Sequence, residues 1–170
     1  VIGGMPVSTQ DITVKLAMEQ LLLIVPRAFN VVPSWAYAGN SCKNPYEISP
    51  RQLQGLPLIL PSAANDIGSI TNHALDHFDI RPQSVTTVSS MQTAAMLVSQ
   101  NMGYLFTSPV FLNLQEEQLS AKIVYCTIPG MPDAREIVAV YHPETHQKEM
   151  IQHFLKLLNK VIFRDQPGMF

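Results

Sequence analysis

Hydroxyl side chains follow three short apolar runs of the chain, and they are the residues best suited to hold a small polar ligand. Ser62, the pair Ser89-Ser90 and the pair Thr107-Ser108 each stand at such a position. A hydroxyl both donates and accepts hydrogen bonds, and the free N–H groups that open a following helix add donors for an anion. The same residue types also serve as plain helix caps and turns. Ser62, Ser90, Thr107 and Ser108 are our candidate ligand-binding residues.

Other kinds of chemistry find little support in the sequence. His73 and His77 have the i, i+4 spacing of a metal pair, but no third ligand is evident. The chain lacks a Gly-x-Ser-x-Gly elbow and a glycine-rich Lys-Ser/Thr loop. Cys42 and Cys126 are the only thiols, without Cys-x-x-Cys spacing. We therefore expect no catalytic residue, no metal and no cofactor.

The elements that position the hydroxyls form a regular series. The sequence predicts a strand over Leu58–Leu60, a helix capped by Asn65 or Asp66, a strand over Val85–Val88, a helix opened by a capping box at Ser89-x-x-Gln92, and a strand over Tyr104–Phe106. This order predicts a parallel sheet with right-handed crossovers. Ligands of such sheets bind beyond the carboxyl ends of the strands, where the hydroxyls lie.

The rest of the chain predicts strands on either side of an irregular segment. Strands are expected over Ile12–Ala17, Gln20–Pro26, Ala121–Ile128 and Arg135–Tyr141, a loop-rich connector over Asn30–Gln54, and a final amphipathic helix capped by Thr145. We expect Trp35 and Tyr37 to pin the connector to the core.

Bulk properties restrict the class of protein. The chain has 170 residues, of which 46% are apolar and 14% charged, with a formal net charge of -2. That composition predicts a packed core and argues against disorder, and the net charge gives this chain no basic surface that would bind nucleic acid. No run of about 18 apolar residues is present, so we expect no membrane span. Two thiols without the spacing of a zinc site or a disulfide framework favour a reducing, cytoplasmic compartment. The opening Val1-Ile2-Gly3-Gly4 indicates a fragment of a longer protein.

Three motifs in order carry a family resemblance: Leu56–Ser62, Thr87–Thr93 with Leu97-Val98, and Met102–Phe106. Together they resemble the effector-binding domain of LysR-type transcriptional regulators. The resemblance covers most of the chain apart from Val31–Tyr46, where we expect an insertion, and the tail. Two departures are Thr107-Ser108-Pro109 in place of the usual Leu-Pro, and the lack in this sequence of the winged helix-turn-helix and the opening part of the first lobe, which the family would place upstream.

The resemblance implies a type II periplasmic-binding-protein-like fold of two lobes, the second largely complete and the first partial. It implies a first-lobe remnant and crossover strand over residues 1–27, a connector over 28–56, the second lobe over 57–128, and the returning strand, closing helix and tail over 129–170. Gly4 and Met5 would then face the effector from the first lobe, or form only a tight turn. The expected partners are a small-molecule effector and further copies of the chain, with DNA bound only by an upstream winged helix-turn-helix.

Two alternatives remain at this point. A solute-binding protein of the same fold would serve a transporter and carry a secretion signal upstream. An enzyme on this fold would need a constellation of catalytic residues that the sequence does not show. The sensor of a regulator is the favoured interpretation.

Overall fold

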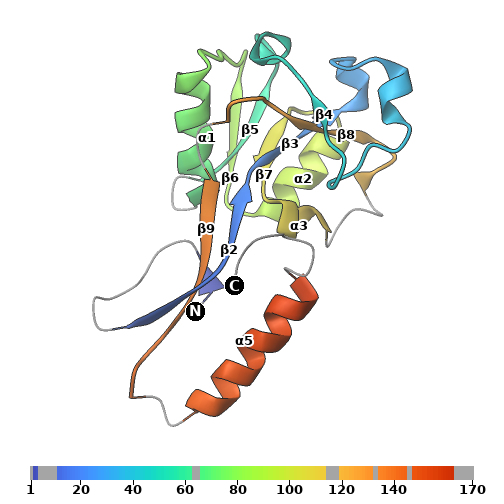
Figure 1. Ribbon diagram of the computed structural model, residues 1–170. Helices are drawn as coiled ribbons and strands as arrows, with labels where there is room; N and C mark the ends of the chain where they lie inside the picture. The colour runs from blue at the N-terminus through green and yellow to red at the C-terminus, as the bar shows by residue number, and fades with distance from the viewer. Residues whose placement is uncertain are drawn as a thin grey trace. The chain divides into compact units, whose positions relative to one another are not determined.

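The computed structural model describes residues 2–3, 11–62, 66–113, 119–131, 134–144 and 147–162. The chain divides into two compact units (Figure 1). Unit 1 consists of Val1–Glu19 and Ala134–Phe170, and unit 2 of Gln20–Asp133. Each unit is described by itself below.

Unit 2 is built on one mixed sheet. Its strands are β3 (Leu22–Pro26), β4 (Tyr46–Glu47), β5 (Leu58–Pro61), β6 (Val85–Val88), β7 (Leu105–Thr107) and β8 (Ile123–Thr127). Four strands pair in the order β4-β8-β3-β7, and the other two pair as β5-β6. A parallel bridge between Leu58 and Tyr104 joins these two parts, and Ile59 N–H donates to the Tyr104 carbonyl at 2.8 Å. The expected parallel arrangement of β5, β6 and β7 is confirmed, whereas β3 runs antiparallel to both β7 and β8.

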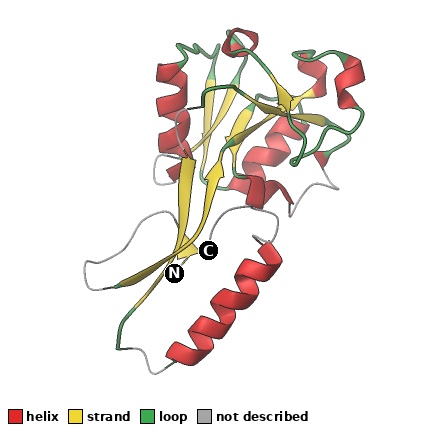
Figure 2. Cartoon of the chain, viewed as in Figure 1, coloured by secondary structure: helices red, strands yellow, loops and turns green. Residues whose placement is uncertain are grey.

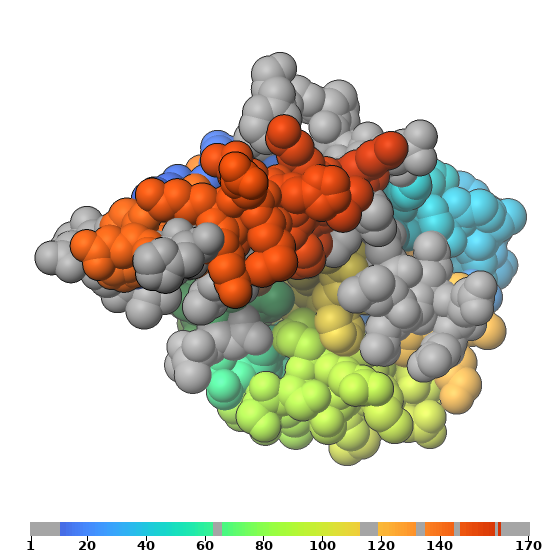
Figure 3. All heavy atoms as spheres, turned by 90° about the horizontal axis from the view of Figure 1, so that it is seen from below, coloured from blue at the N-terminus to red at the C-terminus, as the bar shows by residue number. Residues whose placement is uncertain are grey.

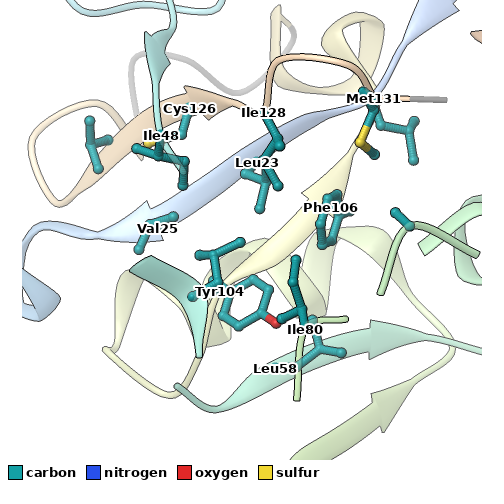
Figure 4. Close-up of a cluster of buried hydrophobic side chains, with 14 of the residues drawn as sticks. Leu23, Val25, Ile48, Leu58, Ile80, Tyr104, Phe106, Cys126, Ile128 and Met131 are labelled. Carbon is teal, nitrogen blue, oxygen red and sulfur yellow. The ribbon is translucent and has the colours of Figure 1, made fainter. Parts of the chain in front are cut away.

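Helices cover both faces of this sheet (Figure 2). Alternation along β3 shows the two faces, since Leu23 and Val25 enter one core cluster and Leu22 and Ile24 the other. The first cluster (Figure 4) packs against α1 (Asp66–His77), and the second packs against α2 (Met91–Ser99). A short helix, α3 (Pro109–Asn113), follows β7, and it was not predicted from the sequence. Proline suits the first turn of a helix, where its missing N–H is not needed.

The connector is more ordered than its composition predicts. It contains the 3₁₀ turns η2 (Ser34–Tyr37) and η3 (Pro50–Leu53) besides β4, and a further 3₁₀ turn, η1 (Arg27–Phe29), directly precedes the connector. The Arg27 guanidinium donates to the carbonyls of Ser120 and Ile123 at 2.7 and 3.0 Å and lies 4.6 Å from the centre of the Tyr37 ring. Tyr37 therefore anchors the connector as expected. Trp35 does not, because it is 71% exposed.

Unit 1 contains a three-stranded sheet in the order β1-β9-β2. Its strands are β1 (Ile2–Gly3), β2 (Ile12–Gln20) and β9 (Ala134–Tyr141), with β1 antiparallel to β9. Two ion pairs join β2 to β9. Lys15 lies 3.1 Å from Glu136 in an exposed pair, and Arg135 lies 2.9 Å from Glu19, whose side chain is fully buried.

The other element of unit 1 is α5 (Lys148–Ile162), which the sequence predicted as an amphipathic helix. Three of its apolar residues, Met150, Phe154 and Leu157, are exposed, whereas Ile151, Leu155 and Leu158 are partly buried. The helix and β9 together form the orange to red surface in Figure 3. Thr145, the expected cap, lies outside the described residues, as does the tail. Within the described ranges, no helix is long and apolar enough to cross a membrane.

Candidate functional site

The parallel strands β5, β6 and β7 bring three of the predicted hydroxyl positions to one edge of the unit 2 sheet. Parallel strands end at the same edge, so Ser62, Ser90 and Thr107-Ser108 follow neighbouring strand ends. Ser62 N–H donates to the Val88 carbonyl at 2.8 Å, which ties the end of β5 to the end of β6. We call Ser62, Ser90, Thr107 and Ser108 the hydroxyl edge.

Ser62 is half-buried in the turn after β5, and α1 approaches this turn closely at Gly68. A Cβ added at Gly68 would lie 2.5 Å from the Pro61 carbonyl oxygen and 2.8 Å from that of Ser62. Both neighbours are backbone atoms, so they have little freedom to move aside. Glycine at position 68 therefore sets the position of the Ser62 turn against α1.

Ser90 is the N-cap of α2. Its backbone is extended, and its Oγ accepts a hydrogen bond from Thr93 N–H at 3.3 Å. The predicted capping box at Ser89-x-x-Gln92 is wrong by one position, because the helix begins at Met91 and its third residue is Thr93. The Ser90 side chain is exposed, and its hydroxyl proton stays available to a ligand.

Thr107 and Ser108 are much less accessible than Ser62 and Ser90. Thr107 is fully buried, and its Oγ1 has no hydrogen-bond partner among the described residues. Ser108 is 3% exposed, and its Oγ accepts from Phe111 N–H at 3.4 Å at the start of α3. A buried hydroxyl without a partner is energetically unfavourable, so Thr107 has unused capacity for a hydrogen bond.

The charge and reactivity of the hydroxyl edge and of the buried Tyr104 and Cys126 of unit 2 follow from their side-chain types and their burial. All four side chains of the hydroxyl edge are uncharged. Tyr104, just before β7, places its hydroxyl among apolar side chains such as Leu58 and Ile80 (Figure 4), and burial raises its pKa. Burial also raises the pKa of Cys126 to about 12, which makes this thiol a poor nucleophile at neutral pH. In the described ranges, His, Cys, Asp and Glu do not gather in groups of three that would suit a metal.

Some features of unit 2 were not predicted from the sequence, and some of the predicted residues lie outside the described part of the chain. Gly4 and Met5 lie outside the described residues. The close approach at Gly68 was missed, although a glycine in a helix that follows a strand turn is a usable signal of close packing. The cavity beside Trp35, described below, was missed because it depends on how the connector folds.

The sequence and the fold were compared with those of known proteins. The sequence matches the family described as "LysR substrate binding domain" over residues 1–162. A search of the curated proteins finds no match.

Several solved structures have the same fold. One is the Synechocystis CcmR regulatory domain in complex with 2-PG, which has a TM-score of 0.70 and 13% sequence identity; the match covers 98% of this chain and 74% of the CcmR chain. A Corynebacterium glutamicum OxyR variant has a TM-score of 0.68 and 16% identity, covering 96% of this chain and 48% of that one. The regulatory domain of MetR, a LysR family regulator from N. meningitidis, has a TM-score of 0.63 and 15% sequence identity. The match covers 98% of this chain and 71% of the MetR chain.

These likenesses confirm the predicted fold class, an α/β fold of the type II periplasmic-binding-protein-like kind. The chain spans about half the length of the OxyR variant and about three quarters of the CcmR domain. The family match covers nearly all of the sequence, so the chain belongs to the LysR substrate-binding domain family.

Proposed function

We propose that this chain is the ligand-sensing domain of a LysR-type transcriptional regulator and that the hydroxyl edge of unit 2 contacts a small-molecule effector. The observation that carries the proposal is the tie between the ends of β5 and β6, where Ser62 N–H donates to the Val88 carbonyl at 2.8 Å beside the exposed Ser90. Family membership supports a regulatory role over a transport role.

The four hydroxyls have different roles in this proposal. Ser62 and Ser90 are accessible and donate to the effector, while the start of α2 adds backbone N–H groups. Thr107 and Ser108 form the floor of the site, and the unpartnered Thr107 hydroxyl accepts or donates when ligand binding opens access to it. Gly4 and Met5 complete the site from the first lobe.

Family membership supports a proposal for the larger assembly. Residues 57–128 form the second lobe, residues 1–27 and 129–170 supply the first-lobe remnant, crossover strands and closing helix, and residues 28–56 connect them. Effector binding alters the geometry of a homo-oligomer, and an upstream winged helix-turn-helix binds DNA in the cytoplasm. The ligand switches that geometry only if it binds one arrangement better than the other. No catalytic step is assigned to the domain.

A thermal-shift screen tests the proposal. The ligands are small carboxylates, aromatic acids, amino-acid derivatives and 2-PG, the molecule bound in the CcmR structure. A ligand present at about 100 times its Kd stabilises the folded protein by about 2.7 kcal/mol. Ser62→Phe should abolish the shift from a ligand that binds here.

The matched control is Ser69→Phe, at an exposed serine of α1. This variant should keep the ligand-induced shift. A full shift in Ser62→Phe would remove the Ser62 turn from the effector site.

A further inference from the structure

A cavity lies in the connector of unit 2, and none of its lining residues belongs to the hydroxyl edge. Its volume is about 180 Å³, and it lies between η2 and β4. Trp35, Asn44, Pro45 and Tyr46 are among the residues that line it, and the other lining residues also lack charge. A ligand pocket for a drug-sized molecule has roughly 300–1,000 Å³. This cavity therefore suits a single ring with its substituents.

Hydrogen bonds fix the shape of the cavity before any ligand arrives. Asn40, in its wall, binds the backbone of β8 twice, accepting from Tyr125 N–H at 2.8 Å and donating to the Tyr125 carbonyl at 2.9 Å. Asn44 donates from Nδ2 to the Gly39 carbonyl at 3.1 Å, and its N–H donates to the Ser41 side chain at 3.2 Å. A site held in this way loses little conformational freedom on binding.

Trp35 is exposed where packing does not require it. Arg27 and Tyr37 already anchor the connector, yet the Trp35 ring is 71% exposed, with its centroid 5.9 Å from that of Tyr46 in an edge-to-face arrangement. Three groups here lack a hydrogen-bond partner within the part of the chain that the structure describes: Trp35 Nε1, the Tyr46 hydroxyl and Asn44 Oδ1. The Trp35 N–H can only donate a hydrogen bond, the Tyr46 hydroxyl can donate and accept, and the Asn44 amide oxygen can only accept.

We propose that this pocket binds a neutral monosaccharide ring. A sugar presents an apolar C–H face that packs against an aromatic ring, and its hydroxyls both donate and accept, which matches the three free groups around Trp35. A charged ligand would gain no ion pair from an uncharged lining. The pocket is a binding site separate from the hydroxyl edge, so it does not depend on the identity of the effector.

Trp35 fluorescence provides the test, because Trp35 is the only tryptophan of the chain. Glucose, galactose and mannose are each titrated into the chain up to tens of millimolar. We expect at least one of them to shift or quench the emission with a saturable curve. Glucose 6-phosphate, a charged analogue, should bind at least about tenfold more weakly.

Two variants localise the binding. Tyr46→Phe removes one hydroxyl and should weaken binding about two- to tenfold, the usual range for one hydrogen bond. Trp35→Ala removes the stacking face, and saturation-transfer NMR in place of fluorescence should show no bound sugar. Met96→Ala, at an exposed methionine of α2, is the control and should bind sugar normally.

Three results would overturn the proposal. One is the lack of a saturable response to all three sugars in a folded chain. Another is unchanged affinity in both pocket variants. The third is a saturable response to a proline-rich peptide or to indole but to none of the sugars, which would assign the aromatic pair to a different class of ligand. Loss of effector binding in Ser62→Phe with normal sugar binding would keep the two sites distinct.

Discussion

Phe106 of unit 2 has no exposed surface, whereas Phe154 of unit 1 is 52% exposed. The same contrast extends to their surroundings. Phe106 lies in a core cluster that draws on β3, β5, β7, β8 and α1, while α5 also leaves Met150 and Leu157 exposed. Unit 2 thus buries a large apolar cluster, whereas unit 1 buries apolar side chains of β2 and β9, such as Leu16 and Val138, and leaves three of those on α5 exposed.

This difference shows where a ligand site gains rigid support. The hydroxyl edge and the Trp35 cavity both lie on unit 2, whose sheet is packed on both faces. Rigid elements hold binding groups in place, so a change in the unit 2 core should affect binding, while a change on α5 should not.

The largest expected effect is a difference in stability between alanine variants of the two phenylalanines. Phe106→Ala removes a fully buried ring and should lower the free energy of unfolding by about 3–5 kcal/mol. Phe154→Ala, at a half-exposed site, should change it by less than about 1 kcal/mol. Urea denaturation followed by circular dichroism measures both values. Equal losses would mean that α5 packs as tightly as the core of unit 2.

A second comparison concerns the two ion pairs of unit 1. Arg135→Met removes the ion pair at 2.9 Å to the buried Glu19 carboxylate and should destabilise β2 and β9 by about 3 kcal/mol. Lys15→Met breaks an exposed pair and should cost at most about 1 kcal/mol. Hydrogen exchange of the β2 and β9 amides reports on these strands directly. A similar loss of protection in both variants would contradict the claim that the buried ion pair contributes more to stability than the exposed one.

A third prediction concerns the approach of α1 to the Ser62 turn. Gly68→Ala places a methyl group against the carbonyl oxygens of Pro61 and Ser62 and should destabilise unit 2 by about 1–3 kcal/mol. It should also weaken the response to any ligand of the hydroxyl edge, because the turn must move. Ser69→Ala, at the next residue of α1, is the control and should leave both properties unchanged. Calorimetry and the thermal-shift screen measure the two effects.

The smallest effect concerns Tyr104. Its hydroxyl is buried and has no hydrogen-bond partner in the described ranges, so Tyr104→Phe should leave stability unchanged or raise it by about 1 kcal/mol. Burial raises the pKa of Tyr104, so the unfolded chain loses this proton first and stability falls as pH rises above about 10. Denaturation curves between pH 9 and 11 should show a shallower fall in the Phe variant. An identical fall would mean that Tyr104 ionises equally easily in both states.

The sequence predicted the series from β5 to β7 because local periodicity and turn residues determine those elements. It predicted the hydroxyl edge because parallel strands end together. It did not predict the antiparallel course of β3, which depends on pairing with residues about a hundred positions away. Nor did it predict the burial of Thr107 and Ser108. That burial accompanies α3, whose start at Pro109 is visible in the sequence only in hindsight.

The connector was the least predictable region. Its Gly, Pro and Asn content indicates loops correctly, but its order comes from contacts such as that of Arg27 with the carbonyls of Ser120 and Ile123. Such side-chain to backbone bonds across long sequence separations leave no periodic signal. The exposure of Trp35 is a consequence of that folding.

The double hydrogen bond between Asn40 and Tyr125 also has a consequence for solubility. The Asn40 amide occupies the N–H and the carbonyl of Tyr125, next to the two residues of β8 that pair with β4. An open strand edge is a template on which another chain can add a strand and start aggregation. The connector therefore shields the β8 edge from the addition of a strand from another chain. The Asn40 side chain makes the two hydrogen bonds to Tyr125 that the backbone of an added strand would otherwise make.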